Sequence, residues 1–267
     1  MTNCIKIDNE DIKIIDLLIN TNIQKEGYYL KRIKSKFSAK FFLFIVMAFL
    51  LVQLPVVGDY VRVLNTVIHE SGHAVIALFG GHIEKIALLS DSEGITYGPE
   101  SGKIEGIVCS MAGYICSSFM GFVSFWLIRK KKYTLLIDIL LGILFLNLIL
   151  WVRNPFGLIW IVSFTFGFLL LLIKGKQTII NHFLLLIASI LLVDSIKSSF
   201  EIFEMSIIHP KFAGDAANLS MLTSFIPTQA WGVFFLVQAL LFPIVSLKKG
   251  LFRIEGIKFS SQKENVL

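Results

Sequence analysis

Long hydrophobic runs, separated by short polar connections, dominate the chain. Most of them reach the roughly 20 residues that a helix needs to cross the hydrocarbon core of a bilayer. The run at 62–80 is short and carries several polar residues, so we expect six or seven crossings. The pattern therefore predicts an all-α polytopic membrane protein. The runs cover about residues 40–57, 62–80, 105–128, 134–152, 155–174, 179–198 and 227–247.

Two longer polar connections interrupt this pattern. The first, at 81–104, is rich in glycine, and hydrophobic positions within 83–88 and 95–97 flank the polar segment 90–94. Short hydrophobic stretches on both sides of such a segment are typical of two strands joined by a turn. We therefore expect a small β-hairpin inserted directly after the run at 62–80. The second polar connection covers residues 199–226.

Composition and charge agree with a membrane protein. Hydrophobic residues make up 55% of the chain and charged residues 16%, whereas about a quarter of a soluble domain is charged. The net charge of +6 does not indicate nucleic-acid binding, because the basic residues cluster at the ends of hydrophobic runs. We expect a multi-pass integral protein of a bacterial cell membrane, with the bilayer as a partner. The predicted parts are a polar N-terminal arm (1–36), a membrane-embedded domain (37–247) and a basic C-terminal tail (248–267).

One hydrophobic run contains a group of ionisable residues. His69 and His73 are four positions apart, so they share one face of a helix, and Glu70 lies between them. Two imidazoles at this spacing can bind one Zn²⁺, and the glutamate can act as a base toward a water molecule at the ion. Ionisable side chains are costly in lipid and are usually functional there. The motif therefore predicts a zinc site with Glu70 as the catalytic residue.

A catalytic zinc site of this type takes a third protein ligand and keeps one position open. Asp194, close to the end of a hydrophobic run, is our first candidate, and Asp215 is the second. Structural alternatives exist for both. Asp194 could pair with Lys197 one helical turn away, and Asp215 could cap the start of a helix. Asp138 lies close to a basic helix end, where a charged side chain can reach the membrane surface.

At these residues the chain resembles the site-2 protease superfamily of membrane zinc metallopeptidases, and more closely its compact members without inserted regulatory domains. The first matching motif is specific in this context, and the others are weak singly but persuasive in order. They are His69-Glu70-Ser71-Gly72-His73-Ala74, Gly80-Gly81-His82-Ile83, Glu93-Gly94-Ile95-Thr96, Ala112-Gly113-Tyr114-Ile115-Cys116-Ser117-Ser118, Val193-Asp194-Ser195-Ile196, Gly214-Asp215-Ala216-Ala217 and Trp231-Gly232.

The resemblance implies that His69 and His73 bind zinc and that Glu70 is the base. It also implies that residues 82–103 form a small sheet beside the site, whose edge could hold an unwound substrate strand. Better-known members carry the third ligand in an Asn-Pro-Asp-Gly or Leu-Asp-Gly motif. Here Asn154-Pro155-Phe156-Gly157 has phenylalanine at the position of the acid, so the third ligand cannot be assigned from this motif.

Two further residues are candidates for substrate binding. Asn154 could orient the substrate or a ligand, although a turn at Arg153-Asn154-Pro155 explains it equally well. Gly94 belongs to the strand region that the resemblance places beside the site.

The predicted function is that of a zinc metalloprotease that hydrolyses peptide bonds of membrane-anchored proteins, as in regulated intramembrane proteolysis. The first alternative is a catalytically inactive protein of the same fold that binds metal or partner helices, which the unassigned third ligand supports. The second is a small transporter, for which charges at the membrane midplane would fit. No internal repeat supports the transporter.

Overall fold

The computed structural model describes residues 38–80, 83–98 and 102–253, so the predicted N-terminal arm and most of the predicted tail lie outside the described residues. Helices make up most of the described chain. They are α2 (Ala39–Leu51), α3 (Val57–Gly80), α4 (Lys103–Arg129), α5 (Tyr133–Leu146), a π-helical turn η1 (Asn147–Trp151), α6 (Pro155–Lys174), α7 (Gln177–Ile208), a 3-10 turn η2 (Pro210–Phe212), α8 (Gly214–Thr223) and α9 (Thr228–Lys248).

Five helical segments in the described part of the chain are long and apolar enough to cross a membrane: α4, α5 with η1, α6, α7 and α9. The apolar helix α2 is shorter, and α3 is long enough but carries several charged residues. These two and the five candidates correspond to the seven hydrophobic runs of the sequence. The predicted class, a helical multi-pass membrane protein with a small strand insertion, is confirmed.

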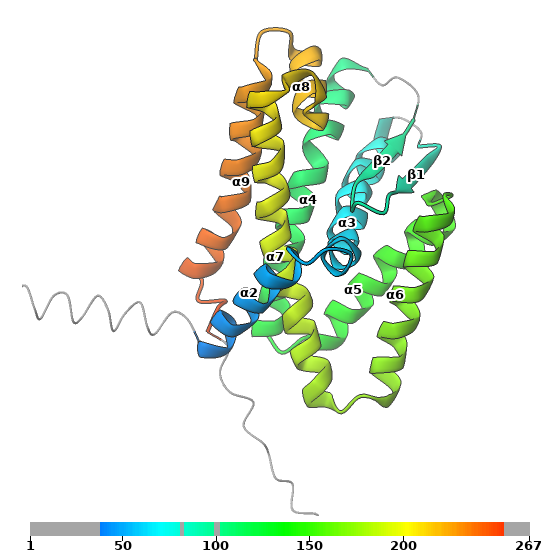
Figure 1. Cartoon of the computed structure of the whole chain (residues 1–267), viewed down its shortest axis with the longest axis vertical. Helices are drawn as coiled ribbons and strands as arrows, with labels where there is room; N and C mark the ends of the chain where they lie inside the picture. The colour runs from blue at the N-terminus through cyan, green and yellow to red at the C-terminus, as the bar shows by residue number, and fades with distance from the viewer. Residues whose placement is uncertain (1–37, 81–82, 99–101, 254–267) are drawn as a thin grey trace, which may run out of the picture.

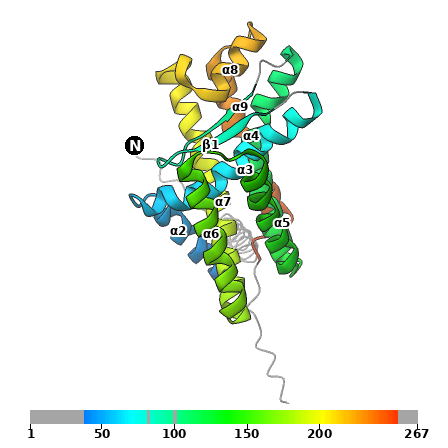
Figure 2. The ribbon, with the colours of Figure 1, turned by 90° about the vertical axis from the view of Figure 1, so that its right-hand side faces the viewer.

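The helices form a bundle in which α3 and α4 are central. In Figure 1, α9 and α7 lie on one side of α4, whereas α3, α5 and α6 lie on the other. Figure 2 shows the second side, with α5 and α6 in front of the rest of the bundle. Aromatic stacking of Phe41 on Phe252, with ring centroids 4.1 Å apart, holds the chain after α9 against the start of α2. Within this bundle α3, the helix that carries the zinc-type motif, packs chiefly against α4.

The predicted hairpin follows α3. Strands β1 (Lys85–Leu88) and β2 (Gly94–Tyr97) pair antiparallel, with Ile86 opposite Thr96 and Leu88 opposite Gly94. On its other side, β1 forms a single parallel bridge from Ile86 to Val152, just after η1. The hairpin thus lies against α3 with β1 toward the start of α6 (Figure 1).

Helix α7 extends further than the sequence pattern predicts. Residues 199–208 were expected in a polar connection, but they continue α7 to Ile208, and α8 follows within the same connection. Glu201 in this part of α7, and Ser198 just before it, line a polar cavity. Their polarity therefore reflects the cavity and not a loop.

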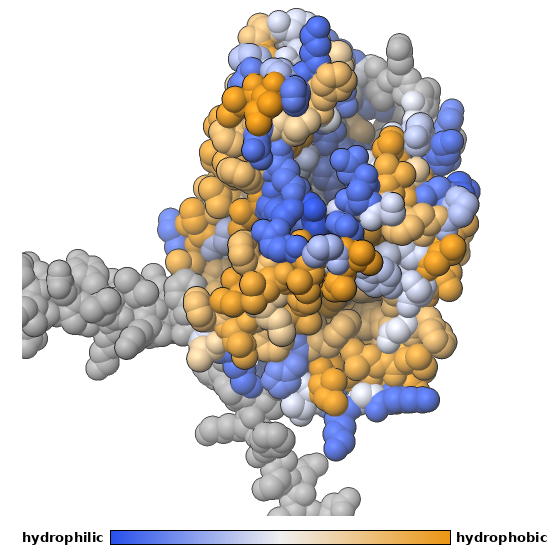
Figure 3. All heavy atoms as spheres, in the orientation of Figure 1, coloured by the Kyte–Doolittle hydropathy of each residue, from blue (hydrophilic) through white to orange (hydrophobic). Residues whose placement is uncertain are grey.

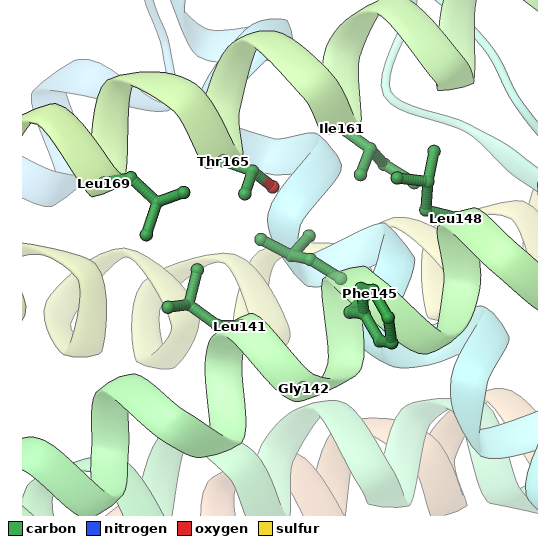
Figure 4. Close-up of a pocket in the computed structure, with 8 residues that line it drawn as sticks. Leu141, Gly142, Phe145, Leu148, Ile161, Thr165 and Leu169 are labelled. Atoms are coloured by element: carbon green, nitrogen blue, oxygen red, sulfur yellow. The ribbon is translucent and has the colours of Figure 1, made fainter.

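A separate crevice lies between α5 with η1 and α6 (Figure 4). It has a volume of about 370 Å³ and an almost entirely apolar lining. Its one polar side chain is Thr165, whose hydroxyl points into the gap between the helices. Because no titratable group lines this crevice, it offers no acid–base or metal chemistry, and the candidate site lies elsewhere.

Candidate metal centre and active site

A second cavity, of about 710 Å³, contains the predicted zinc motif. Residues from α3, the hairpin, α4, α7 and α8 line it, and they include His69, Glu70 and His73. Figure 3 shows hydrophilic residues gathered in a hollow between α7 and the hairpin, above a broad hydrophobic surface. The motif is thus accessible from a polar cleft in an otherwise apolar molecule.

The two histidines direct the same ring nitrogen toward each other. Nε2 of His69 and Nε2 of His73 are 3.0 Å apart, as the spacing of four residues on one helix face predicts. The other ring nitrogen of His73, Nδ1, lies 2.8 Å from the carbonyl oxygen of Cys109 on α4. A carbonyl can only accept, so in the neutral ring the proton is on Nδ1 and the lone pair of Nε2 faces the site. This is the orientation that a metal ligand requires.

Asp215 completes a triangle with these two nitrogens. Its Oδ2 lies 3.3 Å from Nε2 of His69 and 3.4 Å from Nε2 of His73. Ligand atoms at about 2.0–2.1 Å from a tetrahedral zinc ion lie roughly 3.3 Å from one another, so the triangle has the dimensions of a zinc site. Two imidazoles and one carboxylate are also a ligand set that zinc takes in catalytic sites. The residues present therefore fit the ion that the resemblance implies.

Glu70 is the other acid close to the histidines. Its carboxylate and the ligand nitrogens of His69 and His73 all lie within 4.8 Å of one another. The triangle with Asp215 is smaller and matches the spacing of zinc ligands more closely. We therefore treat Asp215 as the third ligand candidate and Glu70 as a neighbour of the site.

Asp215 is the second residue of α8, and its side chain makes no capping bond; the residue before the helix is Ala213. The alternative of Asp215 as a helix cap is therefore not what the structure shows. Burial alone would raise the pKa of the Asp215 carboxyl, but His73 and His69 beside it outweigh burial and hold this pKa well below its usual range. The carboxyl is thus ionised, which is the form that binds a metal.

Asp194, our first candidate from the sequence, lies in a different environment. Its side chain is only 2% exposed and accepts a hydrogen bond of 2.7 Å from Nε of Arg62. Nη2 of Arg62 also donates to Glu201, at 2.6 Å, and Lys197 pairs with Glu201 rather than with Asp194. Asp215, and not Asp194, thus lies beside the two imidazoles, whereas the buried carboxylate of Asp194 pairs with Arg62 on α3.

Glu70 is held against strand β2. The hydroxyl of Thr96 donates to its Oε2 at 2.5 Å, and only 4% of Glu70 is exposed. A Cβ atom at Gly94 would lie 2.5 Å from Oε1 of Glu70 and 2.7 Å from Cγ2 of Thr66. Glycine at position 94 therefore allows β2 to approach α3 closely enough for this contact. The sequence indicates Gly94 as a candidate substrate residue, and the structure places it beside Glu70.

Asn154 does not line the cavity that contains the histidines. Its side chain pairs with the backbone of β1: Leu88 N–H donates to Oδ1 at 3.0 Å, and Nδ2 donates to the Leu88 carbonyl at 2.6 Å. The amide therefore acts like a further strand on the outer edge of β1. The structure gives Asn154 this contact with β1, and its substrate contact stays a prediction. The segment that contains Phe156 begins α6 beside β1, and Phe156 does not line the cavity of the histidines.

Replacing Asn154 by alanine should destabilise the protein. Two backbone groups of the buried residue Leu88 would lose their partner, and each such loss costs about 1–3 kcal/mol. Thermal unfolding of the purified protein in detergent should show a lower midpoint. Asn181→Ala is a suitable control, because it removes only an exposed hydrogen bond with Gln177. Equal midpoints for the two variants would contradict the stabilisation of the outer edge of β1 by Asn154.

Two residues of α4, Gly113 and Tyr114, lie next to the ring of His69, and both belong to the motif at residues 112–118. Tyr114 packs edge-on against its ring, with centroids 4.6 Å apart and planes at 89°. A Cβ at Gly113 would lie 2.5 Å from Nε2 of His69, so only glycine leaves room for the imidazole there.

Sequence reasoning did not single out these two residues of α4, Gly113 and Tyr114, or Thr96 and Arg62. For Arg62 a signal was present, because it is seven residues before His69 and shares its helix face.

Comparison with known proteins adds independent evidence. A family model described as Peptidase M50B-like matches residues 42–246, which is most of the chain. The chain belongs to this family. The family lies within the site-2 protease superfamily, so the predicted relationship is confirmed, and a membrane metallopeptidase fold is indicated. Searches of the curated proteins and of the solved structures gave no match.

Proposed function

We propose that this member of the M50B-like family is a membrane-embedded zinc metalloprotease. It would hydrolyse peptide bonds of membrane-anchored protein substrates, as in regulated intramembrane proteolysis. The observation that carries the proposal is the triangle of His69, His73 and Asp215, with sides of 3.0, 3.3 and 3.4 Å, next to Glu70. A peptidase family and several membrane-spanning candidates support the same function.

The proposed roles follow from the contacts of each residue. His69, His73 and Asp215 would hold the ion, and the Cys109 carbonyl would keep the ring of His73 in the correct tautomer. When bound, Zn²⁺ supplies a Lewis acid that polarises the scissile carbonyl and lowers the pKa of water toward about 7. Glu70 accepts a proton from the attacking water and then donates it to the leaving amine.

The substrate must reach this site in an extended form. Backbone groups of a transmembrane helix are hydrogen-bonded within the helix, so a peptide bond is shielded until the helix unwinds. Strand β2 lies beside Glu70 and could hold the unwound segment by backbone pairing. Helix-breaking residues in the substrate should therefore favour cleavage.

The inactive alternative drew its support from the unassigned third ligand. The position of Asp215, within 3.4 Å of both imidazoles, removes that support. The transporter alternative is less favoured, because the residues that line the polar cavity include a ligand set suited to a metal and an acid suited to hydrolysis.

The direct test uses the full chain purified and reconstituted in liposomes. A single-span model peptide with glycine and proline in its apolar segment serves as the substrate. We expect cleavage and about one zinc ion per chain, with cleavage lost on chelation and restored by added Zn²⁺. A preparation that retains no zinc when supplied with it, and that cleaves no such peptide, would contradict the proposal.

A further inference from the structure

Strand β2 presents its two edges very differently. Its inner edge pairs with β1, and no strand in the described part of the chain pairs with its outer edge. In β1, the carbonyl of Ile86 accepts from the N–H of Arg153 at 3.4 Å, and the backbone of Leu88 is bonded to Asn154. Ile86 and Leu88 thus direct their backbone groups away from β2.

The register extends this observation to β2. Residues that face each other in an antiparallel pair direct their backbone groups in the same sense, either toward each other or outward. Thr96 is opposite Ile86 and Gly94 is opposite Leu88, so these two residues direct their N–H and C=O groups to the outer edge of β2. They are the backbone groups that an added strand would use.

The same two positions lie on the face of β2 that is directed toward Glu70. Along β2 the burial alternates, with Ile95 and Tyr97 each 40% exposed and with Gly94 and Thr96 more buried. The hydroxyl of Thr96 donates a hydrogen bond to Glu70, and the lack of a side chain at Gly94 leaves space for the carboxylate. One residue, Thr96, therefore offers its backbone to an added strand and its side chain to the base.

We infer that Thr96 is a positioning residue for the reaction, an inference that rests on the proposed function. Its hydroxyl holds the Glu70 carboxylate on β2, so that the strand that receives the substrate also aligns the base. A glutamate side chain has several rotatable bonds, and a base contributes fully only when its geometry is fixed. Pairing of a substrate along Gly94 and Thr96 would then place the peptide and the base on one rigid element.

The test compares Thr96→Val with Thr96→Ser in the liposome assay. Valine keeps the shape and the strand preference of threonine but cannot donate, whereas serine keeps the hydroxyl. Misplacing a catalytic group by about 1 Å can cost about 10²-fold, so we expect a fall in kcat of roughly 10- to 100-fold for valine. KM and zinc content should change little, because the backbone edge and the metal ligands remain. Serine should restore most of kcat.

Two matched controls separate positioning from general damage. Thr165→Val removes a hydroxyl that has no hydrogen-bond partner in the described structure, and it should leave kcat unchanged. Thr66→Val removes a bond of 2.6 Å to the carbonyl of Ser92, which also joins α3 to the hairpin but does not involve Glu70. A fall in kcat as large as that of Thr96→Val would show that hairpin docking alone matters, and would overturn the inference.

The remaining outcomes separate this inference from the proposed function. If wild-type protein cleaves and Glu70→Gln does not, but Thr96→Val retains wild-type kcat, the inference alone is wrong. Loss of zinc from Thr96→Val would assign the residue a structural role and would also overturn it. If wild-type protein neither binds zinc nor cleaves, both the proposed function and the inference fail.

Discussion

Replacing Asp215 by alanine should remove bound zinc and abolish peptide hydrolysis. The substitution deletes one corner of the ligand triangle and leaves only the two imidazoles on α3. Outer-shell partners of a metal already contribute about 10- to 100-fold to affinity, so loss of a direct ligand should lower zinc affinity by more than about 100-fold. Metal analysis of the purified variant, beside wild-type protein prepared in parallel, measures this directly.

Two other aspartates provide matched controls. Asp138→Ala, at an exposed position of α5, should keep zinc and stability. Asp194→Ala should keep zinc but unfold at a lower temperature, because Arg62 loses the buried partner to which Nε donates at 2.7 Å. If Asp194→Ala loses zinc while Asp215→Ala retains it, our assignment of the third ligand is wrong and the order expected from the sequence is restored.

The difference between these aspartates shows where the sequence stops being informative. Helix periodicity is local, so the spacing of His69 and His73 predicts their common face, and the distance of 3.0 Å between their Nε2 atoms agrees. The position of an acid more than a hundred residues later depends on how α7 and α8 pack, which no local pattern encodes. The length of α7 was also underestimated, because the polar residues that line the cavity resemble a loop in the sequence.

Arg62 is a feature of the sequence that points to a partner for Asp194. It lies on the same face of α3 as the histidines, and a partly buried arginine favours carboxylate partners. An acid at the end of an apolar run is therefore as well explained by such a cation as by a metal. The same holds for Asn154: its side chain satisfies the edge of β1, a need that becomes visible only when the hairpin is seen in three dimensions.

The second large effect concerns Glu70. Glu70→Gln should lower the rate of peptide hydrolysis by roughly 10²–10⁴-fold, the usual contribution of a general base, while zinc remains bound. Glutamine keeps the size of the side chain, and its carbonyl oxygen can still accept the hydroxyl of Thr96, so the geometry of the site is retained. It cannot take the proton of the attacking water. Cleavage of the model peptide and metal content should be measured on the same preparation.

Glu204→Gln is the control, because it makes the same chemical change at an exposed position of α7 outside the cavity. The two measurements on Glu70→Gln distinguish the roles that this residue could have. Its carboxylate lies within 4.8 Å of the ligand nitrogens of both histidines, so loss of zinc together with activity would make Glu70 a ligand. Full activity with zinc bound would reject Glu70 as the base. Zinc retained with activity lost is the result that a base beside, and not within, the ligand triangle requires.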